Sequence, residues 1–200
     1  MYYSTKDGHP LPHDPFKAIV TPRPIGWISS QSAQGSINLA PYSFFNAVGS
    51  RPPIVMFSSD GRKDSLANIE ETAEFACNFV GENLIHEMSE TSAMVPPDIN
   101  EFDLAGIEMA PCEQIKPPRV RDAYAVLECK LTKIMRQIDL DGADIDTWTV
   151  FGQVVGVHID EDVMTDGRFD LTKAKPVARL GYRDYTVVRD IFELKRPDQK

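Results

Sequence analysis

Two polar segments carry the residue types best suited to holding a small ligand. The first, Asn38 to Asn46, places polar side chains, a proline and three aromatic residues between two strand-like runs, where a simple turn would suffice. Backbone amides in such an irregular segment can hydrogen-bond the edge of a flat heterocycle, with Tyr42, Phe44 or Phe45 packed beside it. The same segment is also compatible with a bulged strand whose aromatic residues belong to the core.

The second segment is Arg62-Lys63-Asp64-Ser65, which directly precedes an expected helix. Two cations, a hydroxyl and the free N–H groups of a helix N-terminus together form a plausible phosphate site. Lysine and serine before a helix are also common as capping and surface residues. A flat-ring site and a phosphate site separated by one strand would suit a flavin mononucleotide.

Other residues that could take part in catalysis or metal binding give weaker evidence for a site. The sequence has no G-x-G-x-x-G after a strand, no P-loop, no G-x-S-x-G and no H-E-x-x-H. His9, His13 and Asp14 are separated by prolines, which forbid the helix that would bring them together, so a solvated arm is expected. His158 is either a packed or surface histidine or a residue near an active site, and His86 is expected to be exposed. No catalytic residue is assigned.

Composition excludes several classes of protein. The chain of 200 residues has a net charge of −9, which disfavours binding to nucleic acid. No apolar run approaches the ~20 residues that span a bilayer, so no membrane segment is expected. The first residues do not follow the pattern of a signal peptide. The three cysteines form no metal or disulfide motif, and Cys77 and Cys129 are expected to be buried thiols in a reducing cytoplasm.

Strand signals dominate the chain, and many strands with few helices predict an antiparallel barrel. We expect one domain over residues 1–200, with an extended arm at 1–15 and an irregular excursion at 94–121 that serves as a flap or a subunit contact. Gly152 and Gly156 indicate close approach of backbone or ligand to a covered strand. The expected strands are Phe16–Val20, Gly26–Ser30, Ile54–Ser58, Glu74–Val80, Ala125–Met135, Trp148–Ile159 and Tyr185–Arg189, and the expected helices are Ser65–Thr72 and Glu82–Thr91.

Several motifs in order resemble the flavin reductase-like family of FMN-binding split barrels, which includes flavoredoxins and the reductase components of two-component monooxygenases. The resemblance runs from about Phe16 to Leu194. Its strongest parts are Thr21-Pro22-Arg23-Pro24-Ile25-Gly26-Trp27-Ile28-Ser29, Asn38-Leu39-Ala40-Pro41-Tyr42-Ser43-Phe44-Phe45 and Lys63-Asp64-Ser65. A weaker part spans Arg179 to Tyr185, where Tyr182-Arg183 departs from many relatives, so no role is assigned to Tyr182 or Tyr185.

The resemblance implies a mainly β fold, a six-stranded antiparallel Greek-key split barrel with a few short helices, and a homodimer with FMN near the subunit interface. FAD is less expected, since the phosphate site is compact and no dinucleotide fingerprint exists. The family pattern places the isoalloxazine and ribityl chain, largely by backbone contacts, on Asn38, Leu39, Ala40, Pro41, Tyr42 and Ser43. It places Trp27 and Ser29 beside the flavin. It surrounds the phosphate with Ser58, Arg62, Lys63, Asp64 and Ser65.

The resemblance leaves three functions open. The first is an NAD(P)H:flavin oxidoreductase that passes hydride to FMN and supplies reduced flavin to a partner oxygenase. The second is a flavoredoxin-like electron carrier that retains its FMN. The third is a non-catalytic FMN-binding module. In a reductase the flavin would carry the chemistry and the protein would orient the two reactants.

Overall fold

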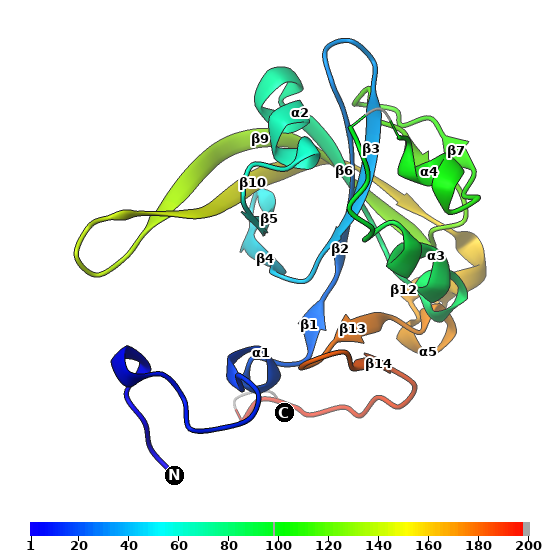
Figure 1. The fold of residues 1–200 in the computed structure, drawn as a ribbon. Helices are drawn as coiled ribbons and strands as arrows, with labels where there is room; N and C mark the ends of the chain where they lie inside the picture. Colours follow the sequence, from blue (N-terminus) through cyan, green and yellow to red (C-terminus); the bar gives the residue numbers. More distant parts are fainter. Residues whose placement is uncertain (98, 198–200) are drawn as a thin grey trace.

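Seven antiparallel strands form the main sheet of this computed structural model, which describes residues 1–97 and 99–197 (Figure 1). The outermost strands, β3 and β4, are consecutive in the chain and joined only by Ser43 and Phe44. Since so short a connection spans only ~10 Å, the sheet must curl until its two edges approach each other. In spatial order the strands are β3 (Ile37–Tyr42), β2 (Gly26–Gln31), β6 (Glu74–Asn78), β9 (Ala125–Ile138), β10 (Asp144–Ile159), β5 (Pro53–Asp60) and β4 (Phe45–Ser50).

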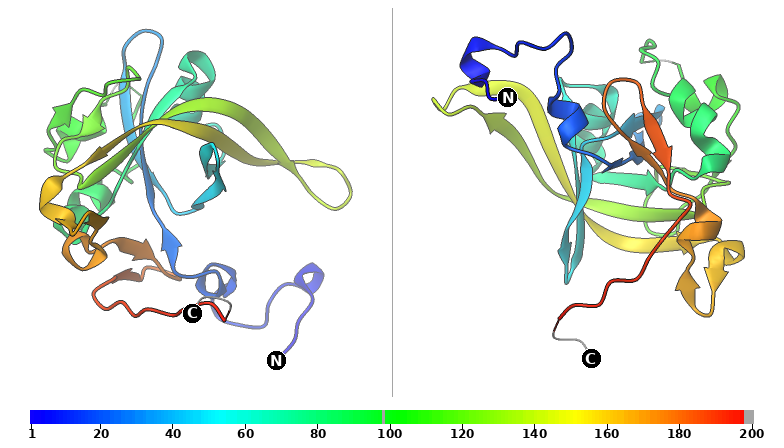
Figure 2. Two further views of the ribbon diagram at one scale, coloured as in Figure 1. Left: turned by 180° about the vertical axis from the view of Figure 1, so that it is seen from behind. Right: turned by 90° about the horizontal axis from the view of Figure 1, so that it is seen from below.

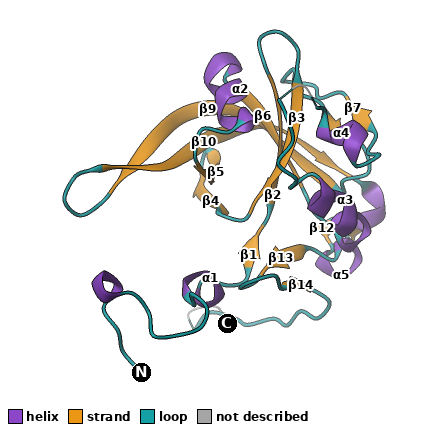
Figure 3. Ribbon diagram, viewed as in Figure 1, coloured by secondary structure: helices purple, strands orange, loops and turns teal. Residues whose placement is uncertain are grey.

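The predicted fold class, a mainly β antiparallel split barrel with short helices, is confirmed (Figure 3). The main sheet has seven strands rather than six. The segment from Asn38 to Asn46, expected to be irregular, instead supplies β3 and β4 on either side of a two-residue corner. Pro41 fits inside β3 because an edge strand has an outward side on which no N–H is needed for the ladder.

Two predicted helical regions are confirmed, and one predicted strand is wrong. Helix α2 (Asp64–Thr72) buries Leu66 and Ile69, as expected from their spacing. The second region divides into η2 (Glu82–Leu84) and α3 (Ile85–Glu90). The run Phe16–Val20 forms the short helix α1 (Phe16–Ile19) rather than a strand. A run of five residues, four of them apolar, is too short to separate the period of a strand from that of a helix, whereas Pro15 and an Asp14 carboxylate that accepts the Phe16 N–H favour a helix start.

Smaller elements surround the barrel mouth (Figures 1 and 2). Strands β13 (Val177–Arg179) and β14 (Tyr185–Val187) join β1 (Arg23–Pro24) in a three-stranded sheet beside α1. The β9–β10 hairpin extends away from the barrel, as Figure 2 shows from two sides. No helix in the described residues is long and apolar enough to cross a membrane. The remaining elements are η1 (Thr5–Asp7), α4 (Glu101–Leu104), β7 (Met109–Ala110), β8 (Arg119–Val120), η3 (Glu161–Val163), β11 (Met164–Thr165), β12 (Arg168–Phe169) and α5 (Leu171–Ala174).

The core has two parts, one on each face of β2. Trp27 packs in the outer cluster with Met88 and Phe102, while its neighbour Ile28 packs in the inner cluster with Phe57. This alternation follows from the two-residue period of a strand, and it leaves both faces of β2 covered. Cys77 and Cys129 are buried in the inner cluster, as predicted.

Gly152 and Gly156 of β10 allow close packing, as the sequence indicated. The groups that approach them are side chains, whereas backbone or a ligand was expected. A Cβ at Gly152 would lie 2.6 Å from Cε1 of Phe75, and a Cβ at Gly156 would lie 3.1 Å from Cδ of Glu128. The inner cluster therefore depends on Gly152 for room for the Phe75 ring.

Candidate functional site

A pocket of about 270 Å³ lies between β3, the N-terminus of α2 and the segment that follows α3. Six of the predicted site residues line it, namely Asn38, Ala40, Pro41, Tyr42, Lys63 and Asp64. A second pocket of about 360 Å³ adjoins the first, because Pro41 and Ser92 line both, and the predicted Ser43 lines the second. Small-molecule sites usually occupy ~300–1000 Å³. The two pockets together therefore offer an elongated space, wide enough for one extended ligand or for two ligands that meet at Pro41.

The edge of β3 has few backbone donors to offer. Leu39 N–H points away from β2 and donates to Glu101 Oε2 at 2.9 Å. Because alternate N–H groups of a strand point the same way, those of Asn38, Ala40 and Tyr42 face β2, and Pro41 has none. Backbone contacts from residues 38–42 to a ligand would therefore come mainly from carbonyl oxygens on the outer side of Leu39 and Pro41.

A buried polar network joins β3 to α2 and α4. With its amide oriented to satisfy both neighbours, Asn38 accepts a hydrogen bond from Ser65 Oγ at 2.7 Å and donates to Glu101 Oε1 at 3.2 Å. Burial raises the pKa of Glu101, and the hydrogen bond from Leu39 N–H only partly offsets this. The network fixes β3 relative to α2. Because the Ser65 hydroxyl donates its hydrogen to Asn38, that hydrogen is not free to bind a ligand.

The N-terminus of α2 retains the properties of an anion site. Lys63 is the N-cap residue and makes no side-chain capping bond. The first helical bond runs from Ala67 N–H to Lys63 O at 3.0 Å, so the N–H groups of Asp64, Ser65 and Leu66 have no partner within the helix. Among the described residues Lys63 has no carboxylate within 4.0 Å. Positive charge and free amides therefore coincide at one wall of the pocket.

Two residues predicted to bind the phosphate, Arg62 and Ser58, instead contact other side chains. Arg62 pairs with Glu70, with 3.0 Å between Nη1 and Oε1, and its guanidinium lies 5.3 Å from the ring centroid of Trp148. The Ser58 hydroxyl lies 2.9 Å from the Thr149 hydroxyl. Neither residue lines the pocket. The partners on β10 lie far away in the sequence, so the pattern around Arg62 gave no sign of them.

Three other predicted residues lie behind the pocket. Trp27 is fully buried, and its Nε1–H donates to Thr91 Oγ1 at 2.9 Å. Since Thr91 lines the pocket, Trp27 supports the wall without reaching the cavity. Ser29 is also buried and donates to Pro118 O at 2.6 Å. The Leu39 side chain lies in the outer core cluster.

Tyr42 is buried beside the pocket, with its hydroxyl near those of Ser59 and Ser65. In the described part of the chain this hydroxyl makes no hydrogen bond of acceptable geometry. Burial raises the pKa of Tyr42, and the two serines offset that only in part. The phenol is thus neutral, and its hydroxyl lies buried behind the pocket wall.

The far wall of the pocket was not predicted from the sequence. It comes from the turn after α3 and from α4, both within or next to the excursion at 94–121. Nothing in this loop has the spacing of a known motif, and its packing against β3 depends on the buried Glu101. The unpredicted lining residues are Thr91, Ser92, Ala93, Met94, Val95 and Glu101.

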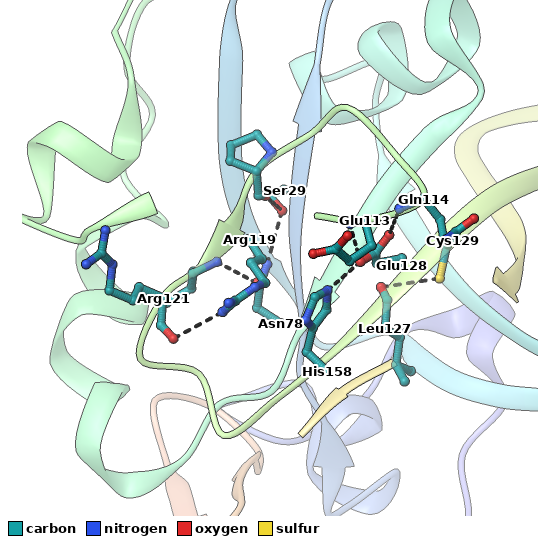
Figure 4. Close-up of polar contacts among 12 residues, drawn as sticks. Ser29, Asn78, Glu113, Gln114, Arg119, Arg121, Leu127, Glu128, Cys129 and His158 are labelled. Atoms are coloured by element: carbon teal, nitrogen blue, oxygen red, sulfur yellow. Dashed lines mark hydrogen bonds and ion pairs between the residues drawn. The ribbon is translucent and has the colours of Figure 1, made fainter. Parts of the chain in front are cut away.

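His158 belongs to a separate polar cluster, drawn in Figure 4. Its Nε2 contacts Glu128, a fully buried carboxylate that also accepts the N–H of Glu113 at 2.8 Å and the N–H of Gln114 at 2.6 Å. Burial alone would raise the pKa of Glu128, but these hydrogen bonds outweigh it, and the pKa lies below its ordinary value. Neither His158 nor Glu128 lines the pocket on β3, and the His158 ring is packed against Glu128. His86 is exposed, as predicted.

Comparison with known proteins places this architecture in a family. The family sequence model described as "Flavin reductase like domain" matches residues 19–178 of this chain. An uncharacterized protein of Aquifex aeolicus is 34% identical over 173 residues, which cover 84% of this chain and 85% of that protein. Nitrilotriacetate monooxygenase component B from Bacillus cereus has a TM-score of 0.87 at 29% identity, covering 97% and 98% of the two chains. The 2-nitrobenzoate 2-nitroreductase NbaA of Pseudomonas fluorescens has a TM-score of 0.81 at 31% identity, covering 92% and 90%. The chain therefore belongs to the flavin reductase-like family of flavin-binding split barrels.

Proposed function

We propose that this protein binds FMN in the pocket on β3 and works as an NAD(P)H-dependent flavin reductase. One observation carries the binding site: the N-terminus of α2, which has no side-chain cap, lies with Lys63 beside an edge strand that forms one wall of an elongated pocket, and no carboxylate of the described residues lies within 4.0 Å of Lys63. The phosphate would accept hydrogen bonds from the N–H groups at the start of α2, with Lys63 supplying a charge. Asp64 faces the same pocket, so its carboxylate would have to turn away from the phosphate.

The flavin ring would lie along Ala40 and Pro41 in the first pocket, and Pro41 is where this pocket meets the second. The flat edge of β3 suits a planar ring, because Pro41 presents no N–H and its side chain is apolar. FMN is preferred to FAD, since one helix N-terminus provides a site for one phosphate group.

When bound, the flavin accepts a hydride from a reduced nicotinamide. The residues of this chain would hold the two rings in contact and exclude water, which can raise the effective concentration of one reactant to ~10⁵ M or more. The Asn38–Glu101–Ser65 network would keep β3 fixed during this encounter. No acid–base pair is required at the pocket, because the hydride passes directly between the two rings.

The proposal includes a homodimer and a partner oxygenase. The open end of the barrel carries an apolar pocket of about 280 Å³. Val157 and Ile159 border it and remain 57% and 47% exposed, as expected for a surface that a second copy covers. The similar protein from Bacillus cereus is named as a component of a monooxygenase, which supports a role in supplying reduced flavin.

The test uses purified protein loaded with FMN under anaerobic conditions. Absorbance at ~450 nm reports oxidised flavin, and NADH or NADPH is added with a large excess of free FMN. Multiple turnovers of free FMN are expected. Reduction limited to one equivalent per site would support a flavoredoxin-like carrier instead, and bound flavin that neither nucleotide reduces would favour the non-catalytic module. Absence of flavin binding would contradict the whole proposal.

A further inference from the structure

The second pocket is surrounded by positive charge although the chain as a whole is acidic. Lys17 of α1, Arg23 of β1 and Arg179 of β13 line this cavity of about 360 Å³, in a protein with a net charge of −9. Within residues 1–97 and 99–197 none of the three has a carboxylate within 4.0 Å. The other lining residues are Ile25, Pro41, Ser43, Met88, Ser92, Leu180, Tyr182 and Tyr185.

Neutral groups hold these cations in place. Arg23 is buried, and its guanidinium donates to Val20 O at 2.6 Å and to Leu180 O at 2.8 Å, with a further contact to Lys17 O. Arg179 donates to Tyr182 O at 2.6 Å and stacks 4.4 Å from the ring centroid of Tyr185. Carbonyl oxygens and aromatic rings orient a cation without cancelling its charge. The pocket therefore keeps a positive potential.

The cations also repel one another, and the fold tolerates the cost. Burial lowers the pKa of Arg23, and the nearby charge of Arg179 lowers it further. An anion between these side chains would relieve the repulsion. Such an anion would sit beside Ser43 and Pro41, and Pro41 also borders the pocket on β3.

We propose that this second pocket binds the diphosphate of the nicotinamide dinucleotide. The inference rests on the proposed flavin reductase function. Lys17 and Arg179 would contact the anion, because both reach the cavity from its rim. Arg23 already donates its hydrogen bonds to carbonyl oxygens, so it would attract the anion by its charge without contacting it. The shared wall at Pro41 would then allow the nicotinamide of the same molecule to reach a flavin on β3.

A diphosphate fits this arrangement better than a single carboxylate. A dinucleotide diphosphate carries two negative charges, and the three cations come from three separate elements around the cavity. Arginine and lysine at such spacing are typical of phosphate recognition. An aromatic carboxylate and the phosphate of FMN itself are the competing occupants, and the experiment distinguishes them.

The probe is ADP-ribose, which has the diphosphate but no nicotinamide, titrated by calorimetry into the FMN-loaded protein. Lys17→Gln and Arg179→Gln should each raise the dissociation constant of ADP-ribose about tenfold or more, because each removes a charge-assisted hydrogen bond. Their dissociation constants for FMN should stay within about twofold of the wild-type value, a margin well below the loss of one such bond. Arg183→Gln removes the same charge from an exposed neighbour that does not line the cavity, and it should change neither constant.

Three results would overturn the inference. ADP-ribose could bind equally to wild type and both variants, or the variants could lose FMN affinity instead, which would place the FMN phosphate here. Alternatively, 2-nitrobenzoate could bind in a manner that depends on Lys17 and Arg179 while ADP-ribose does not. A failure of the proposed function looks different: ADP-ribose binds as expected, yet neither NADH nor NADPH reduces the bound flavin. Lys17 is exposed on a short helix, so its variant tests the site even if Arg179→Gln folds poorly.

Discussion

Arg62 and Lys63 are neighbours with the same charge, yet they lie in different surroundings. Arg62 is paired with Glu70 and stacked on Trp148, whereas Lys63 faces the pocket without a carboxylate partner in the described chain. The proposal therefore assigns phosphate binding to Lys63 and to the amides that follow it. This gives a matched pair of variants, one residue apart, with opposite expected results.

Lys63→Gln should raise the dissociation constant of FMN about tenfold, since a charge-assisted hydrogen bond is worth ~1.5–3 kcal/mol. Arg62→Gln is the control and should leave FMN affinity nearly unchanged. Quenching of flavin fluorescence on titration measures both constants. Equal losses in the two variants would place the phosphate elsewhere.

Ionised Glu128 should make the free energy of unfolding depend on pH in the acid range. Its pKa in the folded protein lies below the ordinary value of ~4.3, so its contribution is fully present above that ordinary value. The contribution is lost as the pH falls through the folded-state pKa. Glu128→Gln should lower the free energy of unfolding at pH 7 by ~1–3 kcal/mol, because two backbone N–H groups lose a charged acceptor.

Urea denaturation at a series of pH values measures this effect. The difference between wild type and Glu128→Gln should shrink once the pH falls below the ordinary carboxyl pKa of ~4.3, because the unfolded chain then binds a proton that folded Glu128 does not. Glu113→Gln changes an exposed glutamate in the loop whose backbone N–H groups bind Glu128, and it should behave like wild type. A difference that stays constant down to pH 3 would rule out the ionised carboxylate as the stabilising group.

At the scale of elements, α1 stays in place because Gly181 leaves room for it. A Cβ at Gly181 would lie 2.7 Å from Cα of Ala18, which is backbone and cannot move aside cheaply. Gly181→Ala should therefore displace α1 and with it Lys17. We expect a rise of about tenfold in the dissociation constant of ADP-ribose, comparable to the loss of the Lys17 contact, while FMN affinity changes little.

Calorimetry on the Gly181→Ala variant provides that measurement. The control is Arg183→Gln, which changes an exposed residue of the same turn that does not line the second pocket. Unchanged ADP-ribose affinity in Gly181→Ala would mean that the position of α1 does not matter to the second pocket.

The elements that the sequence predicted correctly are those with long or well-bounded patterns. Helix α2 followed from Leu66 and Ile69 on one face, and the β9 and β10 strands followed from runs of a dozen residues or so. Phe16–Val20 was too short for its period to be decided. Asn38 to Asn46 looked irregular because Pro41 is rare in strands, and only the edge position of β3 makes it acceptable.

The site was predicted in the same uneven way. Lys63 and Asp64 both line the pocket, because a helix start fixes its own geometry locally. Ser58 and Arg62 instead contact Thr149 and Trp148 of β10, and Trp27 donates a hydrogen bond to Thr91. These contacts join residues that lie 64 or more positions apart. No local pattern encodes such pairs.

At the scale of the whole molecule, the apolar open end of the barrel predicts a homodimer. Replacing Val157 by lysine would put a charge among Phe79, Ile159 and Phe169, which border the same pocket. Burying an unpaired charge at an interface costs several kcal/mol, so Val157→Lys should be monomeric where wild type is dimeric. Sedimentation velocity measures both states.

The matched control is Val48→Lys, at another exposed valine that does not border this pocket. It should remain dimeric. A wild-type protein that sediments as a monomer at micromolar concentration would contradict the proposed dimer, without bearing on the flavin pocket of one subunit.

The central claim is that one pocket on β3 and α2 holds a flavin by its phosphate. The most direct measurement compares the dissociation constants of FMN and riboflavin, which differ only in that phosphate, for the wild-type protein. The account predicts that FMN binds at least about tenfold more tightly, through the free amides of α2 and the charge of Lys63. Equal affinity for the two flavins, or binding of neither, would contradict it.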